Sequence, residues 1–260
     1  MKCGNLGKSI NVHDIRETFY INHRKSLVIN GQIAYTGGLN IGNEYVGFFD
    51  AFGDWVDLHV RLVGSAVKSM VVIFLKDWLF LTNQKIHHNH KNSFLPINNK
   101  KKVKLNNICQ FINETPGIRN SQTQNLFLHL INQAKKRIYI TTPLFYIHSQ
   151  LEKSLCNAAL SGINVSIFLP DLNFVYINDH LRQLYYNNLL KAGVKIYEFN
   201  DAYIHSKLIL IDDKISAIGS CNLDFRSFYL SSETIMLLCN PQVVQDLDQK
   251  FFKVISNLLI

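Results

Sequence analysis

Apolar and polar residues alternate with two different periods along the chain, and these periods predict its secondary structure. From residue 121 onward, helical and strand patterns follow one another. The helical stretches are 121–136, 149–161, 178–192 and a last one that begins near residue 241. The strand stretches are 137–142, 164–169, 194–199, a hairpin at 203–218 and a strand at 232–239. Strands that alternate with helices favour a layered α/β domain.

The N-terminal part carries fewer elements. Residues 18–36 are rich in strand-forming residues, and Asn30-Gly31 lies between two apolar runs. Both residues tolerate the positive φ of a type I′ turn, so this pair predicts a β-hairpin. Residues 55–63 predict another strand, and residues 65–82 predict a helix.

Residues 83–107 differ from both flanks, because they are polar and basic and contain Pro96. Such a composition predicts a linker. The chain is therefore expected to divide into a part at 1–82, the linker at 83–107 and a second part at 108–260.

One short pattern occurs in both parts. His23 and Lys25 match His205 and Lys207 at an offset of 182 residues. Further matches at the same offset are Asn30 with Asp212, Ile33 with Ile215, Gly37-Gly38 with Gly219-Ser220, and Asn40 with Asn222. A single H-x-K indicates little and fits an exposed strand with ordinary polar residues. Two patterned copies indicate a duplicated unit that supplies the same chemical groups twice.

The repeated residues suit chemistry on a phosphate. On a strand, the histidine and lysine of each copy would point to one side, about 7 Å apart, while Arg24 and Ser206 point away. An imidazole attacks phosphorus or moves a proton near neutral pH, and a lysine offers positive charge to phosphate oxygens. Asn40 and Asn222 can donate amide hydrogens to the same oxygens. Together the two copies would form a phosphodiester site that needs no metal.

The net charge of +8 favours an anionic partner such as a phospholipid surface, nucleic acid or a phosphorylated metabolite. The five cysteines show no C-x-x-C pair, which supports neither a disulfide framework nor a zinc site. Histidines 87, 88 and 90 lack a spaced partner set, so no metal is expected, and no other cofactor either. The apolar run at 70–81 is too short to span a bilayer and contains Lys76 and Asp77. If this protein works at a membrane, we therefore expect it to be peripheral or to have been cut away from its anchor.

The two copies resemble the H-x-K-x4-D signature of the phospholipase D superfamily. Further segments resemble bacterial cardiolipin synthases; these are 23–45, 55–61, 192–198 and 219–228. The resemblance implies a phospholipase D-like two-lobe α/β fold, with mixed β-sheets flanked by helices and an active site between the lobes. Residues 1–82 would be a partial first lobe, and residues 108–260 would be the second lobe.

The resemblance also implies a two-step phosphatidyl transfer. One histidine attacks the phosphate of phosphatidylglycerol, which gives a phosphatidyl-histidine and releases glycerol. The other histidine protonates that glycerol and then deprotonates the hydroxyl of a second phosphatidylglycerol, which attacks to give cardiolipin. His23 is assigned as the nucleophile and His205 as the acid/base. The expected partners are phosphatidylglycerol and a membrane surface, with no nucleic acid.

The same resemblance assigns the remaining site residues. Lys25, Lys207, Asn40 and Asn222 would hold phosphate oxygens, and Asp212 counts among the catalytic residues of the second copy. Each imidazole also needs a carboxylate to orient it through its other nitrogen. These carboxylates are predicted to be Asp57 for His23 and Glu233 for His205.

Two departures from the family pattern stand out. Asn30 occupies the position of the signature aspartate, and its place in the hairpin turn favours a structural role over a charge that supports the lysine or the histidine. The first copy also has a much shorter lead-in than the second, so we expect an incomplete first lobe and an N-terminally shortened chain. Two alternatives stay open: another phosphodiesterase of the superfamily, either a phospholipase or a nuclease, and a truncated inactive remnant.

Overall fold

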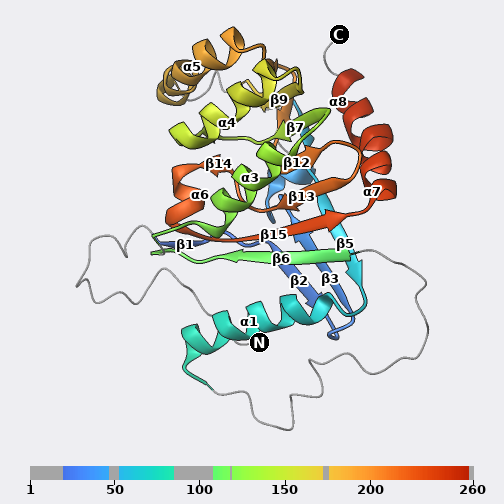
Figure 1. Cartoon of the computed structure of the whole chain (residues 1–260). Coiled ribbons are helices and arrows are strands. Elements are labelled where there is room, and N and C mark those ends of the chain that lie inside the picture. Colours follow the sequence, from blue (N-terminus) through green and yellow to red (C-terminus); the bar gives the residue numbers. More distant parts are fainter. Residues whose placement is uncertain (1–19, 47–52, 85–107, 118, 172–175, 258–260) are drawn as a thin grey trace.

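The computed structural model describes residues 20–46, 53–84, 108–117, 119–171 and 176–257. Most of the second part of the chain builds one mixed, eight-stranded sheet, with strand order β1-β15-β13-β12-β7-β9-β10 and with β6 also paired to β15 (Figure 1). These strands are β1 (Ile21–Asn22), β6 (Ile108–Glu114), β7 (Arg137–Thr141), β9 (Asn164–Pro170), β10 (Lys195–Phe199), β12 (Leu208–Ile211), β13 (Ile215–Gly219) and β15 (Ser231–Cys239).

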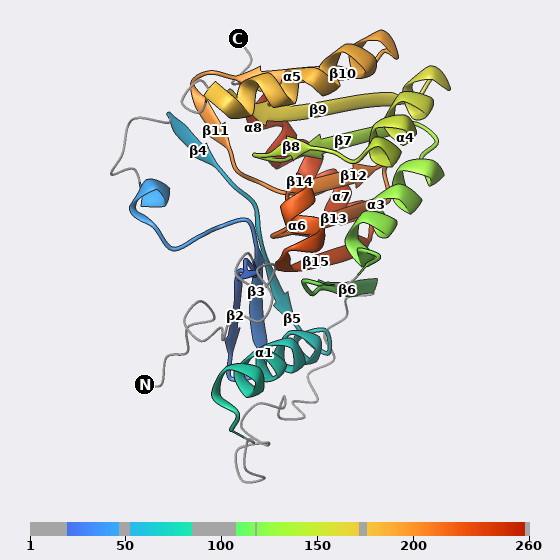
Figure 2. The same ribbon diagram turned by 90° about the vertical axis from the view of Figure 1, so that its left-hand side faces the viewer.

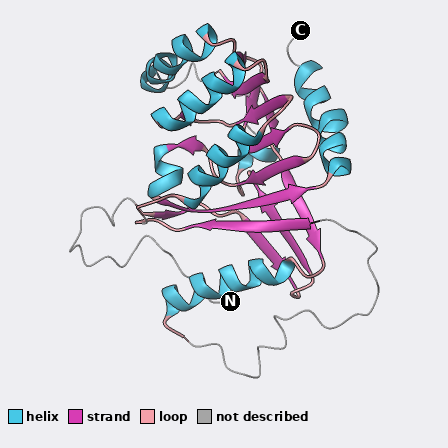
Figure 3. Ribbon diagram, viewed as in Figure 1, coloured by secondary structure: helices cyan, strands magenta, loops and turns pink. Residues whose placement is uncertain are grey.

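Helices cover both faces of this sheet, as Figure 3 shows. On one face lie α3 (Gln122–Gln133), α4 (Ser149–Leu160), α5 (Tyr176–Lys191) and the short α6 (Phe225–Tyr229). On the other face lie α7 (Pro241–Asp246), a π-helical turn at Leu247–Phe252 and α8 (Lys253–Asn257). Each face has its own core, because Phe127, Leu151 and Ile167 belong to one buried cluster and Phe251 belongs to the other. Two short strands, β8 (Phe145–Tyr146) and β14 (Leu223–Asp224), pair with each other.

The first part of the chain forms a smaller layer. Its three-stranded sheet has the order β2-β3-β5, and the strands are β2 (Ser26–Ile29), β3 (Ile33–Gly37) and β5 (His59–Val63). Helix α1 (Val67–Thr82) packs on this sheet (Figure 2). Ala34 and Leu62 of the sheet and Met70 of α1 share one buried cluster with Ile218 and Met236 of the large sheet. The two lobes are therefore joined by a continuous apolar core.

Two parallel strand pairs cross between the lobes. Strand β1, from the first part of the chain, pairs with β15 of the second. In return, β11 (Ala202–Ile204), from the second part, pairs with β4 (Asp54–Val56) of the first. Each part of the chain thus supplies one strand that pairs with a strand of the other part. An H-x-K segment begins directly after each of these two strands, β1 and β11.

Local sequence explains where several elements begin and end. The Ser121 hydroxyl accepts a hydrogen bond from the Gln124 amide at the start of α3, and Asn240 caps α7 with Pro241 in the first turn. Asn30 and Gly31 adopt φ values of 51° and 62°, as the Asn-Gly turn predicts.

Most predicted elements after residue 121 are present within a few residues of their expected ends. The single strand predicted at 55–63 is interrupted at Asp57-Leu58, which divides it into β4 and β5. Neither β6 nor α6 was predicted from the sequence. The predicted linker at 83–107 lies outside the described residues from 85 onward, so the domain boundaries stay a prediction.

Candidate functional site

The first catalytic candidate, His23, follows directly after β1. Its backbone amide donates to the carbonyl of Ser232, at 3.0 Å, which continues the parallel pairing of β1 with β15. The next residue on β15 is Glu233, and its Oε1 lies 2.9 Å from Nδ1 of His23. Glu233 is fully buried. A fixed carboxylate on Nδ1 holds the ring orientation and leaves Nε2 for chemistry.

The second candidate, His205, repeats this geometry after β11. Its backbone amide donates to the carbonyl of Val56 at 2.8 Å, and its Nδ1 lies 2.8 Å from Oδ2 of Asp57. Asp57 follows β4 just as Glu233 follows the first residues of β15. The structure therefore contains two equivalent histidine–carboxylate pairs.

These pairs correct one prediction. Asp57 was expected to orient His23 and Glu233 to orient His205, but the structure exchanges the two carboxylates. The physical reason is the reciprocal strand pairing. Because β1 runs beside β15 and β11 runs beside β4, each histidine lies next to a carboxylate from the other lobe.

The H-x-K segments also differ from the extended strand that was expected. Residues 23–25 and 205–207 connect strands of different sheets. Each lysine turns back toward its own histidine: Lys25 Nζ donates to the carbonyl of His23 at 2.9 Å, and Lys207 Nζ donates to the carbonyl of His205. Lys207 Nζ also lies 3.0 Å from both ring nitrogens of His205.

The residues between histidine and lysine point away from the site, as expected, but they are anchored differently. Arg24 forms an ion pair with Asp77 of α1, at 2.9 and 2.7 Å, and donates to the carbonyl of Glu114 at 2.9 Å. Ser206 instead donates a buried hydrogen bond to Thr141, at 2.8 Å. An ion pair thus anchors the first H-x-K segment, and a hydrogen bond between two hydroxyl groups anchors the second.

The two lysines belong to one electrostatic cluster. Burial lowers the pKa of Lys25 to about 8 and that of Lys207 to about 7, and the charges of Asp57 and Glu233 act in the opposite direction on both. Each lysine therefore responds to the carboxylates of both pairs, which supports one shared site. Burial also lowers the pKa of His205, with Lys207 and Lys25 adding to that effect and Asp57 opposing it. An anion in this site would relieve the cost of charging these buried groups.

The repeated position after Gly37 and Gly219 supports each carboxylate in a different way. In the second copy, the hydroxyl of Ser220 donates to Oε2 of Glu233. In the first copy, Gly38 leaves room for Asp57, since a Cβ atom at position 38 would lie 2.1 Å from Oδ1 of Asp57. That Oδ1 accepts from the Leu58 amide at 2.7 Å.

Tyr45 is a site residue that sequence reasoning did not single out. Its hydroxyl lies 2.9 Å from Nδ1 of His205, and its ring packs 4.7 Å from the ring of Trp55. Burial raises the pKa of Tyr45 to about 12. The phenol is therefore neutral and acts as a hydrogen-bonding group beside His205. The one sequence signal that included it was the resemblance of segment 23–45, whose last residue is Tyr45.

The two predicted phosphate-binding asparagines differ in their surroundings. Asn40 hydrogen-bonds to Tyr45, and it is half-buried. Asn222 is buried, and its Oδ1 has no hydrogen-bond partner among the described residues. Their contact with a phosphate stays a prediction.

Asp212 was predicted to be a catalytic residue, and its contacts in the structure are those of a turn residue. Its carboxylate accepts hydrogen bonds from the backbone amides of Lys135, Lys136 and Arg137, at 2.7–3.1 Å. Its φ of 53° places it in the β12–β13 turn, at the end of β12 that lies away from His205. Burial is the largest single effect on the pKa of Asp212 and acts to raise it. The hydrogen bonds from the three backbone amides together outweigh burial and lower the pKa below its usual value. The exposed Asn30 holds the equivalent turn, with φ 51°.

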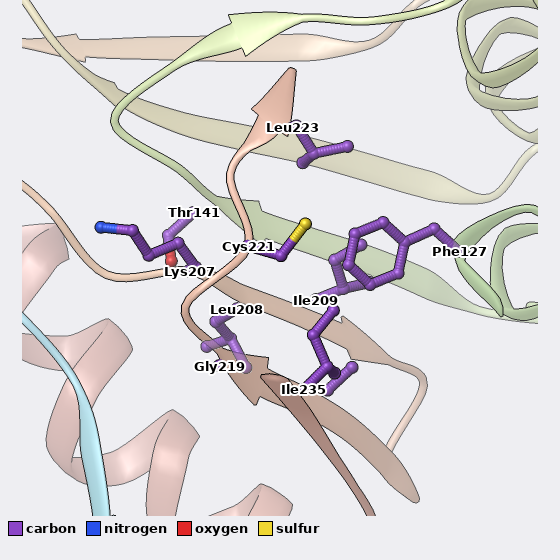
Figure 4. A pocket seen from close by; sticks show the side chains of 10 residues that line it. Phe127, Thr141, Lys207, Leu208, Ile209, Gly219, Cys221, Leu223 and Ile235 are labelled. Atoms are coloured by element: carbon purple, nitrogen blue, oxygen red, sulfur yellow. The ribbon is translucent and has the colours of Figure 1, made fainter. Parts of the chain in front are cut away.

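A small apolar pocket lies under the second copy. Figure 4 shows the Lys207 side chain, whose amino group points away from Phe127 and Cys221 on the pocket wall. Cys221 is buried, and burial raises its thiol pKa well above the usual value. Apart from Thr141 and Lys207, the residues that line this pocket are apolar or glycine.

Fold and site together define a phospholipase D-like protein, and comparison with known proteins agrees. Residues 127–255 match a domain family described as "Cardiolipin synthase, PLD-like domain". Phosphatidylserine synthase of Haemophilus influenzae shares the fold, with a TM-score of 0.65 and 20% identity over 92% of this chain and 62% of that one.

The particular relatives that the chain matches include bacterial cardiolipin synthases. The chain is 39% identical to a cardiolipin synthase of Halalkalibacterium halodurans, over 89% of this chain and 45% of that protein. It is 36% identical to the major cardiolipin synthase of Bacillus subtilis, over 89% of this chain and 47% of that protein. The chain thus spans about half the length of these relatives. None of the described helices combines the length and the apolar composition that a membrane span requires.

Proposed function

We propose that this protein catalyses a phosphatidyl transfer that condenses two phosphatidylglycerol molecules to cardiolipin and glycerol. The observation that carries the proposal is the pair of exchanged histidine–carboxylate contacts, at 2.9 and 2.8 Å, in a cluster that also contains Lys25 and Lys207. Two oriented imidazoles and two cationic groups are what a two-step exchange at one phosphate requires.

In the first step, Nε2 of one histidine attacks the phosphorus of phosphatidylglycerol, and the bond between phosphorus and the glycerol oxygen breaks. The second histidine, protonated on Nε2, gives its proton to the leaving oxygen. Glycerol departs and a phosphatidyl-histidine remains. Lys25 and Lys207 neutralise the charge on the phosphate oxygens, and Asn40 and Asn222 are the proposed amide donors to them.

In the second step, the now neutral histidine takes the proton from a hydroxyl of a second phosphatidylglycerol. The resulting oxygen attacks phosphorus, the phosphorus–nitrogen bond breaks, and cardiolipin forms. We assign His23 as the nucleophile and His205 as the acid/base. Because burial lowers the pKa of His205, its acid role depends on the negative charge of the bound phosphate, which favours the protonated ring.

The proposed lipid substrate implies that the protein works at a membrane surface. Its net charge of +8 suits anionic headgroups. We therefore propose a peripheral association of the described residues with the cytoplasmic membrane.

Glycerol release from phosphatidylglycerol, measured in the presence of a chelator, tests the reaction. We expect release by the unmodified protein and a loss of about a hundredfold or more in His23→Ala and in His205→Ala, since each substitution removes a participating group. The matched control is His129→Ala, on α3 and outside the site. Release that is unchanged in both site variants would contradict the proposal.

A further inference from the structure

Helix α1 has an outer face that the proposed reaction does not use. Its buried residues Val67, Met70 and Val71 point into the core. On the opposite side lie five exposed residues at helical spacing, which we call the α1 outer face. They are Lys68, Val72, Lys76, Leu79 and Phe80.

This face is apolar and positively charged. The exposed fractions of its apolar residues are 50% for Val72, 46% for Leu79 and 79% for Phe80. A helix on the surface of a soluble domain normally presents mainly polar residues to water. Asp77, the acidic residue of α1, does not offset the lysines, because it forms the ion pair with Arg24 toward the site.

Among the described residues, α1 stands apart from the other helices. In both Figure 1 and Figure 2, α1 lies at the lower end of the molecule, beside the three-stranded sheet and apart from the helices of the large sheet. At 16 residues it is suited to lie along a surface, and it is too short to cross a bilayer.

We infer that the α1 outer face is the surface by which this protein docks on an anionic lipid bilayer. Leu79, Phe80 and Val72 would enter the boundary between headgroups and acyl chains, while Lys68 and Lys76 would contact lipid phosphates. The inference rests on the proposed lipid reaction, because a protein that acts on phosphatidylglycerol must meet it at such a surface. Charge complementarity supports it, since the chain has 27 basic and 19 acidic residues.

Docking through α1 would also hold the first catalytic segment near the lipid. Asp77 on the inner side of α1 binds Arg24, which adjoins His23. One helix therefore carries both the docking face and an ion pair with the segment that contains His23.

Vesicle co-sedimentation tests this inference. The vesicles contain phosphatidylglycerol and phosphatidylcholine in equal amounts, with vesicles of phosphatidylcholine alone for comparison. Leu79→Gln combined with Phe80→Gln is expected to reduce the ratio of bound to free protein by roughly tenfold or more. This double variant removes the two largest apolar side chains that would enter the bilayer. Lys68→Gln combined with Lys76→Gln is expected to reduce it by about fivefold per lysine, and only with phosphatidylglycerol present.

Matched controls use equally exposed residues elsewhere. Leu160→Gln with Leu184→Gln, at 70% and 69% exposure, controls for the apolar pair. Lys153→Gln with Lys195→Gln controls for the loss of two exposed charges. Binding that falls equally in test and control variants, or does not fall at all, overturns the inference. A self-association that the apolar pair abolishes while vesicle binding persists would overturn it too, and would assign the face to a second copy of the chain.

Turnover in two lipid forms separates this inference from the proposed function. The apolar pair should lose glycerol release from vesicles and keep it with phosphatidylglycerol dispersed in detergent micelles. If the unmodified protein releases no glycerol in either form, the proposed reaction fails, and the binding comparison alone then decides whether α1 docks on lipid.

Discussion

At the scale of single residues, the most informative feature is that each imidazole is oriented from the opposite lobe. Asp57 holds His205, and Glu233 holds His23. A carboxylate in this position fixes the tautomer and stabilises the imidazolium that forms during proton transfer. Its amide counterpart keeps the shape and loses both effects.

We therefore expect Asp57→Asn to lower glycerol release by about a thousandfold or more while the protein stays folded. The measurement is the release rate under single-turnover conditions, together with the circular dichroism spectrum. Asp213→Asn, on an exposed carboxylate that contacts Lys136 and Arg137, is the control and should retain full activity. Full activity in Asp57→Asn would mean that His205 does not depend on this contact.

Gly38 allows a second prediction about the same carboxylate. A Cβ atom there would lie 2.1 Å from Oδ1 of Asp57, so Gly38→Ala must displace that side chain. Since Asp57 also binds His205, we expect about a tenfold or greater loss of turnover. A crystal structure of the variant should show a longer distance between Asp57 and His205. A normal distance with normal turnover would refute the prediction.

At the scale of elements, the β12–β13 turn shows how a signature residue can serve the fold. The Asp212 carboxylate accepts from three backbone amides at the start of β7, and Asp212 itself has a positive φ. The sequence pattern placed it with the catalytic groups because it recurs at a fixed distance from the histidine. That fixed distance reflects the length of β12.

Asp212→Ala is accordingly expected to lower the free energy of unfolding by about 1–3 kcal/mol, because three backbone amide donors lose a charged acceptor. Asp212→Asn keeps the turn conformation and an acceptor oxygen, so it should lose less stability and retain turnover per folded molecule. Urea titration gives the first quantity, and glycerol release corrected for the folded fraction gives the second. Turnover that collapses in the fully folded Asn variant would support the predicted catalytic role.

At the scale of the whole molecule, pH should move stability and substrate binding in opposite directions. Lys25 and Lys207 have pKa values of about 8 and about 7 in the folded protein, below the usual lysine value, mainly because they are buried. Between those values and the normal pKa of lysine, the unfolded chain binds more protons. The contribution of these groups to the free energy of unfolding therefore rises with pH across that window.

Phosphate binding follows the reverse trend, because the neutral lysines that form above about pH 8 no longer attract the anion. We expect a weaker affinity for phosphatidylglycerol at pH 9 than at pH 7, alongside a rising stability term. Lys207→Met isolates that term, since the difference in unfolding free energy between the two proteins should change with pH over the same window. A difference that is constant with pH would contradict the lowered pKa.

The features that could be predicted from the sequence are those that depend on residues close together in the chain. The turn at Asn30-Gly31, helix α1 and the two H-x-K segments follow from patterns within a few residues, and the structure contains them. The exchanged carboxylates depend on the pairing of β1 with β15, whose partners lie 210 residues apart, and no local pattern encodes that register. Tyr45 was missed for the same reason, because only the fold brings its hydroxyl to His205.

The reciprocal strand pairing has a consequence for how activity arises during folding. A lobe that folds by itself carries a histidine without its carboxylate and a carboxylate without its histidine. Neither lobe alone therefore contains a complete histidine–carboxylate pair. Competence should therefore appear in a single late event, when the halves dock and both imidazoles are fixed together.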